Sequence, residues 1–215
     1  MTPRFILSVV TLSLACIGSV QAKLQSLDLH QKGDQLLTLD DRSGLEWLDL
    51  TQSLNTNSAI LAREMLPGGR YAGFQWAKAA EVKTLFRDAG WSGDLGKAVT
   101  SADVEAARTL VSFLGTTADF GTGTSGTQLA LGRVADILIG PGVTTSVSVE
   151  YDLSNPNMNL RYAFFSINPW VSDNGSPAIG AFLFRPTSAV PEPTTTCLLL
   201  AGLGLLSVAR HRRHK

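Results

Sequence analysis

Acidic side chains in the N-terminal third form the first pattern whose residue types could carry chemistry. Asp40, Asp41, Glu46 and Asp49 are the densest acid cluster of the chain. Two carboxylates can act as a glycosidase pair, and several carboxylate oxygens can hold Ca²⁺. No EF-hand pattern is present, and Asp40-Asp41 falls in an expected turn, where Asp is common. We therefore interpret these residues as turn and surface acids. Calcium binding by Asp40, Asp41 and Asp49 and catalysis by a carboxylate pair are the alternatives.

The four tryptophans are the second pattern, because an exposed aromatic ring can stack on the apolar face of a sugar. Trp47 and Trp76 lie in short apolar segments, so we expect them in the core. Trp91 follows the glycine that ends an expected helix, and Trp170 lies in an expected loop over 169–177. We expect these two to be exposed, which makes Trp91 and Trp170 the candidate glycan contacts.

A glycine pattern and the rare residue types exclude several other sites. Gly121-x-Gly123-x-x-Gly126 matches the dinucleotide fingerprint, but it follows a helix and a loop rather than a strand, so we expect a loop there. Residues 23–190 contain no cysteine and one histidine, His30. A disulfide, a zinc–thiolate site and a multi-histidine site are therefore excluded from this segment. We expect His30 on the surface of a strand, and we expect no cofactor and no metal.

Hydrophobic periodicity predicts an α+β fold, an antiparallel sheet meander with two or three packed helices. Apolar stripes at helical spacing predict helices over 79–89 and 101–114, the second capped by Ser101, and Asn57 or Ser58 begins a shorter one. The 45–50 segment is mixed on both faces, so we expect it to be covered on more than one side. Expected strands are 24–30, 35–40, 127–139, 143–153, 160–168 and 178–185.

The charge balance of this central segment excludes nucleic acid as a partner. Residues 23–190 carry 13 basic and 17 acidic side chains, a net charge of −4. A nucleic-acid-binding domain needs a basic surface to neutralise phosphates.

The two ends of the chain have the pattern of address segments. Residues 1–22 have a positive start, an apolar run and Val20-Gln21-Ala22, which is typical of a signal peptide and its cleavage site. At the other end, Pro191-Glu192-Pro193 precedes an apolar segment over 195–209 and a basic tail containing Arg210, Arg212 and Arg213. The apolar segment is typical of a short membrane helix, and the positive-inside rule keeps the tail cytoplasmic. We therefore divide the chain into a signal peptide, an exported domain over 23–189 and a C-terminal segment over 190–215.

This C-terminal arrangement resembles the PEP-CTERM sorting signal of Gram-negative bacteria. The resemblance rests on Pro191-Glu192-Pro193, the Leu/Gly/Ala segment and the Arg-rich end. It implies recognition by an exosortase, a membrane protease or transpeptidase, and removal of the signal near the Pro-Glu-Pro. In that family the mature protein passes transiently through the inner membrane and reaches the cell surface or the exopolysaccharide matrix of biofilms.

The exported domain also resembles bodies that carry this signal. Leu45-Glu46-Trp47 after a Ser-Gly turn, and Glu81-Val82-Lys83-Thr84-Leu85-Phe86 after Trp76-Ala77, recur in them. The order is more faintly similar to the lectin-like domain of a bacterial collagen-like adhesin, although this chain lacks its Arg-Leu-Pro.

These observations predict an exported surface or matrix protein whose body is a non-enzymatic binding or structural module. Its expected partners are signal peptidase, the exosortase, the inner membrane transiently and exopolysaccharide. An extracellular glycan hydrolase using a carboxylate pair and a calcium-dependent adhesion module are the alternatives.

Overall fold

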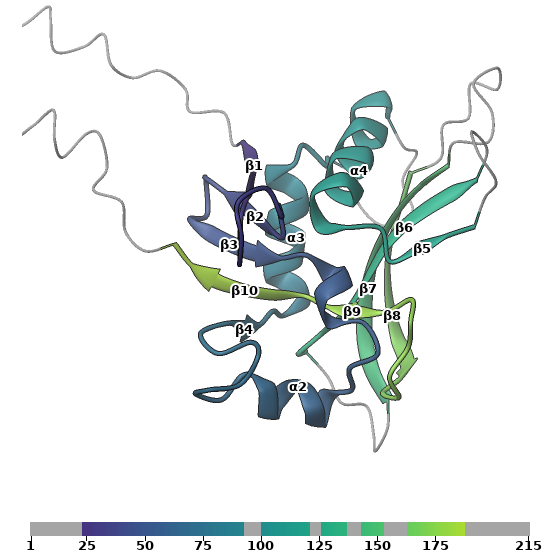
Figure 1. Cartoon of the computed structure of the whole chain (residues 1–215). Helices are drawn as coiled ribbons and strands as arrows, with labels where there is room; N and C mark the ends of the chain where they lie inside the picture. The colour runs from purple at the N-terminus through teal and green to yellow at the C-terminus, as the bar shows by residue number, and fades with distance from the viewer. Residues whose placement is uncertain (1–22, 93–99, 121–125, 137–142, 153–162, 188–215) are drawn as a thin grey trace, which may run out of the picture. The chain divides into compact units, whose positions relative to one another are not determined.

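A computed structural model describes residues 23–92, 100–120, 126–136, 143–152 and 163–187 (Figure 1). It confirms the α+β class: two mainly antiparallel sheets pack with three α-helices and one short 3₁₀ helix. The chain divides into two compact units, Met1–Arg185 and Pro186–Lys215. The predicted leader over 1–22 and the apolar segment over 195–209 lie outside the described residues. Within the described part, every helix is too short or too polar to cross a membrane.

The first sheet has the strand order β1-β2-β3-β10-β4. Strands β1 (Leu24–Leu27), β2 (Leu37–Asp40) and β3 (Leu45–Leu48) form an antiparallel meander, as the sequence predicts. The next strand in space is β10 (Leu183–Pro186), which comes from the end of the domain and pairs antiparallel with β4 (Gln75–Trp76). The N-terminal sheet is therefore completed by the last strand of the domain.

The second sheet has the order β5-β6-β7-β8. Its long strands are β6 (Thr127–Val134), β7 (Val143–Asp152) and β8 (Ala163–Ser172), and β5 (Ala118–Asp119) is short. They pair antiparallel, while β9 (Gly180–Ala181) pairs parallel with β6. Strand β8 extends beyond the predicted 160–168 and includes Trp170.

The single meander that the sequence predicts is wrong at the 178–185 segment. This segment is not one strand, because β9 joins the second sheet and β10 joins the first. Phe182, between them, donates its N–H to the carbonyl of Arg133 (3.0 Å) and accepts from the N–H of Ala77 (2.8 Å). A short stretch of chain thus links the two sheets.

The three α-helices begin and end within a residue or two of where local sequence signals place them. They are α2 (Ser58–Glu64), α3 (Ala79–Asp88) and α4 (Ser101–Leu114). The short 3₁₀ helix η1 (Leu50–Ser53) was not predicted. The predicted apolar stripes of α3 and α4 are buried. The cap of α4 is Thr100 rather than Ser101, because the Thr100 hydroxyl accepts from the N–H of Asp103 (3.2 Å).

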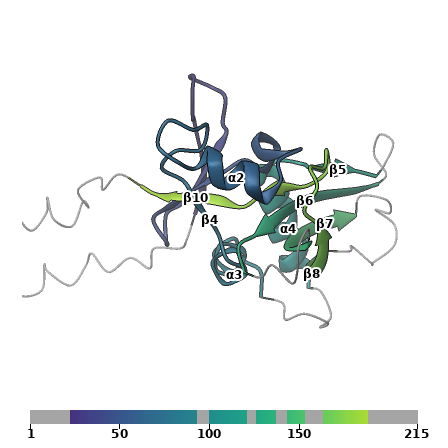
Figure 2. The same ribbon diagram turned by 90° about the horizontal axis from the view of Figure 1, so that it is seen from below.

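The first sheet separates two hydrophobic cores. Trp47 and Leu48 are adjacent in β3, so their side chains point to opposite faces, yet they are only 1% and 2% exposed. Trp47 belongs to the larger core with α3, α4 and the second sheet, whereas Leu48 packs with Leu61 of α2 and with Tyr71. Figure 2 shows α2 and α3 on opposite sides of β10. The expectation that the 45–50 segment is covered on both faces is confirmed.

A buried arginine on β6 ties the second sheet to the loops around it. Arg133 is 1% exposed, and its guanidinium donates to four backbone carbonyls, those of Thr56, Ser172, Asn174 and Ile179. Burial lowers the pKa of Arg133, and the charge of nearby Asp173 opposes that shift. Arginine stays charged in proteins even so, and its fan of donors suits several carbonyls at once.

Replacing Arg133 with methionine is expected to lower the free energy of unfolding by about 3 kcal/mol, because several buried carbonyls lose their donor. Arg87→Met is the matched control, since Arg87 is exposed on α3 and its loss should change stability by less than about 0.5 kcal/mol. Urea denaturation of both variants measures the difference. Equal stability of the two variants would contradict this role for Arg133.

Asp103 holds together the two ends of the segment between α3 and α4. Its carboxylate accepts from the N–H and hydroxyl of Ser92 (2.8 and 3.0 Å) and of Thr100 (2.8 and 2.6 Å). Burial alone would raise the pKa of Asp103, but these hydrogen bonds outweigh it and lower the pKa to about 2.

We expect Asp103→Asn to lower the free energy of unfolding at pH 7 by about 2 kcal/mol, the equivalent of the pKa depression. The folded-state pKa lies below the unfolded one, so this stabilisation is present above pH 4 and is lost as the pH falls towards 2. The gap between wild type and variant should therefore close over that window in urea titrations. Glu105→Gln, an exposed acid of the same helix, is the control, and a gap independent of pH would argue against the prediction.

Candidate functional site

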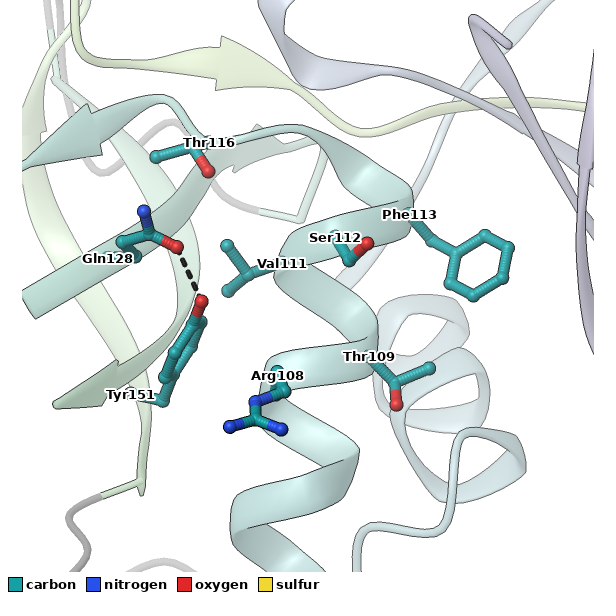
Figure 3. A pocket seen from close by; sticks show the side chains of 8 residues that line it. All are labelled: Arg108, Thr109, Val111, Ser112, Phe113, Thr116, Gln128 and Tyr151. Atoms are coloured by element: carbon teal, nitrogen blue, oxygen red, sulfur yellow. Dashed lines mark hydrogen bonds between the residues drawn. The ribbon is translucent and has the colours of Figure 1, made fainter. Parts of the chain in front are cut away.

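A groove of about 490 Å³ lies between α4 and the strands β6 and β7 (Figure 3). Helix α4 contributes most of its lining, and each strand contributes one residue. The lining residues are Arg108, Thr109, Val111, Ser112, Phe113, Thr116, Gln128 and Tyr151. None of these residues was a predicted site residue, because they come from α4, the loop after it and two strands, and are of ordinary types.

The strand side of the groove is positioned by the alternation of β7. Val147 and Val149 are fully buried, and Tyr151 continues their face to the point where it becomes half-exposed. Gln128 lies directly opposite Tyr151 in the β6–β7 pairing. The Tyr151 hydroxyl donates to Oε1 of Gln128, and Nε2 of Gln128 donates to Oδ2 of Asp119 at 3.2 Å. Both side chains are therefore held in fixed orientations.

The helix side of the groove follows from the burial of α4. Val104, Leu110 and Val111 face the core, which leaves Arg108 exposed at the edge of that face. Figure 3 shows Arg108 and Val111 on the side of the helix that faces Tyr151 and Gln128, whereas Thr109 and Phe113 project to its other side.

The groove combines two aromatic rings, an amide, hydroxyl groups and one guanidinium. None of its eight lining residues is an acid, a histidine or a cysteine. The groove can therefore contact a ligand through hydrogen bonds, aromatic rings and one positive charge.

The predicted calcium candidates occupy separate local networks. Asp40 is fully buried and accepts from the hydroxyl of Ser43 (2.6 Å). Asp41 is exposed and accepts from the N–H of Lys23 (2.6 Å). Asp49 caps η1 through the N–H of Thr51 (2.8 Å), and burial raises its pKa. Within the described ranges, no group of three or more acid, histidine or cysteine side chains could hold a metal ion.

The fourth acid of that cluster, Glu46, pairs with another charge. Its Oε2 lies 2.7 Å from Nε of Arg185 on β10, and Glu46 sits on β3 beside it. The four acids that lie close together in the sequence are thus divided among a turn, a helix cap and a cross-strand ion pair.

The expectation that Trp91 is exposed is wrong. Trp91 is 8% exposed and belongs to the larger core. Gly90 ends α3 with a φ of 99°, and the N–H of Trp91 then donates to the carbonyl of Phe86 at 2.9 Å. This is the Schellman arrangement, which turns the second residue after the helix back onto its last turn. Trp170 lies in β8 rather than in a loop, and its side chain is outside the described residues.

His30 lies in the loop after β1 rather than in a strand, and its side chain is exposed. Its N–H donates to Asp34 at 2.8 Å, as do those of Leu29 and Gln31 at 2.9 Å. Burial would raise the pKa of Asp34, but the backbone hydrogen bonds lower it to about 2. This loop is thus organised around a carboxylate rather than around the histidine.

A buried pair of carboxyl groups, Asp40 and Asp88, was not predicted from the sequence. Asp88 ends α3, its side chain is 5% exposed, and its Oδ1 lies 3.2 Å from Nη1 of Arg42. Burial, and then the neighbouring carboxyl of Asp40, raise the pKa of Asp88, while Arg42 opposes the shift. An acid at the C-terminus of a helix also opposes the helix dipole. Both carboxyls are too enclosed to reach a substrate.

Asp88→Asn is expected to raise the free energy of unfolding at pH 7 by about 1 kcal/mol, because the amide can donate to Asp40 and carries no charge. The folded-state pKa of Asp88 is raised, so wild type loses stability as the pH rises through that pKa, and the variant should not. Urea denaturation between pH 4 and pH 7 tests this against Asp41→Asn, an exposed acid of the same turn. A variant less stable than wild type at pH 7 would show that the Arg42 ion pair dominates.

The predicted sorting residues, Pro191, Glu192 and Pro193 with Arg210, Arg212 and Arg213, lie outside the described residues. Comparison with curated proteins gave no match to the chain. Comparison with solved structures gave none either. Residues 189–213 match the family model of the PEP-CTERM protein-sorting motif. This confirms the resemblance found in the sequence and implies processing by an exosortase on the way to the cell surface. The chain thus carries the PEP-CTERM protein-sorting motif of exosortase substrates.

Proposed function

We propose that the protein is an exported module of a Gram-negative cell surface or exopolysaccharide matrix, as in a biofilm. Signal peptidase removes residues 1–22, the apolar segment over 195–209 anchors the chain transiently in the inner membrane, and the exosortase then acts near Pro191-Glu192-Pro193. The observation that carries this proposal is the match of residues 189–213 to the sorting motif.

The body acts in this proposal as a non-enzymatic binding or structural module. The acids that suggested catalysis or calcium binding are engaged in turns, caps and ion pairs. The groove beside α4 offers hydrogen-bonding and aromatic groups without an acid–base pair. These features favour binding over hydrolysis.

Processing should depend on the two prolines of the motif. Each proline fixes its own φ and keeps the residue before it extended, and an extended backbone fits a protease cleft. We therefore expect Pro191→Ala with Pro193→Ala to leave the C-terminal segment uncut and the protein in the inner-membrane fraction. Mass spectrometry of the protein from each cell fraction measures both outcomes.

The matched control is Pro67→Ala with Pro177→Ala, two exposed prolines of the body, which should be processed like wild type. If the Pro191/Pro193 variant reached the matrix at the mature mass of wild type, the sorting proposal would be wrong.

A further inference from the structure

We propose that the groove between α4 and the strands β6 and β7 binds a carboxylated sugar residue of a glycan chain. This inference rests on the proposed function of the body as a binding module, and it names the site and the class of ligand. The groove residues that carry it are Arg108, Thr116, Gln128 and Tyr151.

The size and composition of the groove suit a sugar. A volume of about 490 Å³ lies within the range of small-ligand sites. A pyranose ring has one relatively apolar face and a rim of hydroxyl groups, so it needs an apolar contact surrounded by polar groups. Tyr151, which is partly exposed, supplies the apolar contact, and the hydroxyl of Thr116 and the amide of Gln128 supply polar groups around it (Figure 3).

The aromatic contact is preorganised before any ligand arrives. Tyr151 packs against the larger core, its hydroxyl is bonded to Gln128, and Gln128 is held in turn by Asp119. A ring fixed from both ends loses little side-chain entropy on binding, which favours affinity.

The charge of the groove selects an anionic sugar. Arg108 is the one charged residue among the lining residues, so the charge at the groove itself is positive. Its ion pair with Glu105 is long, 3.6 Å, and both side chains are more than half exposed, 57% and 55%. A pair of this kind contributes little, so a ligand carboxylate can displace it and take the guanidinium in a bidentate contact. A neutral sugar would leave this charge unused.

Calorimetric titration of the full-length protein in detergent tests the proposal with three probes. Oligogalacturonate carries sugar rings and carboxylates, dextran carries sugar rings alone, and polyglutamate carries carboxylates alone. We expect binding of oligogalacturonate, at least tenfold weaker binding of dextran, and at least tenfold weaker binding of polyglutamate. Polyglutamate binding as tight as that of oligogalacturonate would overturn the proposal, because carboxylates alone would then suffice for binding and the sugar ring would contribute nothing. An absence of oligogalacturonate binding would overturn it too.

Variants locate the binding in the groove. Arg108→Gln should weaken oligogalacturonate binding about tenfold, the effect of losing one charge-assisted contact, and should leave dextran binding unchanged. Tyr151→Leu keeps an apolar side chain in the core and should weaken binding of both glycans. Arg87→Gln, an exposed arginine of α3, is the control. Equal affinities of the Arg108 and Arg87 variants would overturn the proposal.

Failure of the site and failure of the proposed function give different results. A wild-type protein that is processed and reaches the matrix, yet does not bind oligogalacturonate, would overturn the groove and leave the sorting proposal standing. A protein that binds oligogalacturonate through Arg108 but is never processed would support the groove and overturn the sorting proposal.

Discussion

The buried charge of Arg133 is the constraint on which the arrangement of the domain depends. A guanidinium removed from water must find acceptors, and the ones it finds are carbonyls from the start of α2, the end of β8 and the turn before β9. The carbonyl of Arg133 in turn accepts from Phe182 and from the indole of Trp76 (3.1 Å). Beside it, a Cβ on Gly132 would lie 2.6 Å from the ring of Phe182, so only glycine fits this crossing. Gly132 and Arg133 of β6 thereby contact both the second sheet and the segment that leads to the first.

The strand that follows this crossing, β10, lies just before the sorting segment in the sequence. The body needs β10, because it completes the first sheet between β3 and β4 and contributes Leu183 and Phe184 to the two cores. Strand β10 ends at Pro186, and the matched motif starts at residue 189. Cleavage near Pro191 would therefore remove no strand of the domain, and the exported body could keep its fold after processing.

The parts of the fold that local signals specify could be predicted from the sequence. The apolar stripes of α3 and α4, the alternation of β7 and the two-sided burial of Trp47 and Leu48 can all be read from neighbouring residues. The separation of β9 from β10 could not, because it depends on contacts with Arg133, about fifty residues earlier. The burial of Trp91 has a related cause: its place after a helix predicts exposure, whereas the Schellman turn at Gly90 directs the side chain inward.

The same distinction explains why acids that lie close together in the sequence have local structural roles. A cluster of acids is conspicuous in a sequence, but carboxylates are also the strongest acceptors for backbone N–H groups in turns and caps. Asp34, Asp49 and Asp103 all serve in this way, and they do so through neighbours within about a dozen residues. A binding surface needs side chains that converge from distant segments and that are not already hydrogen-bonded to the backbone of their own turn. Arg108 and Tyr151 meet that condition only because α4 packs across β6 and β7, and nothing in either local sequence records it.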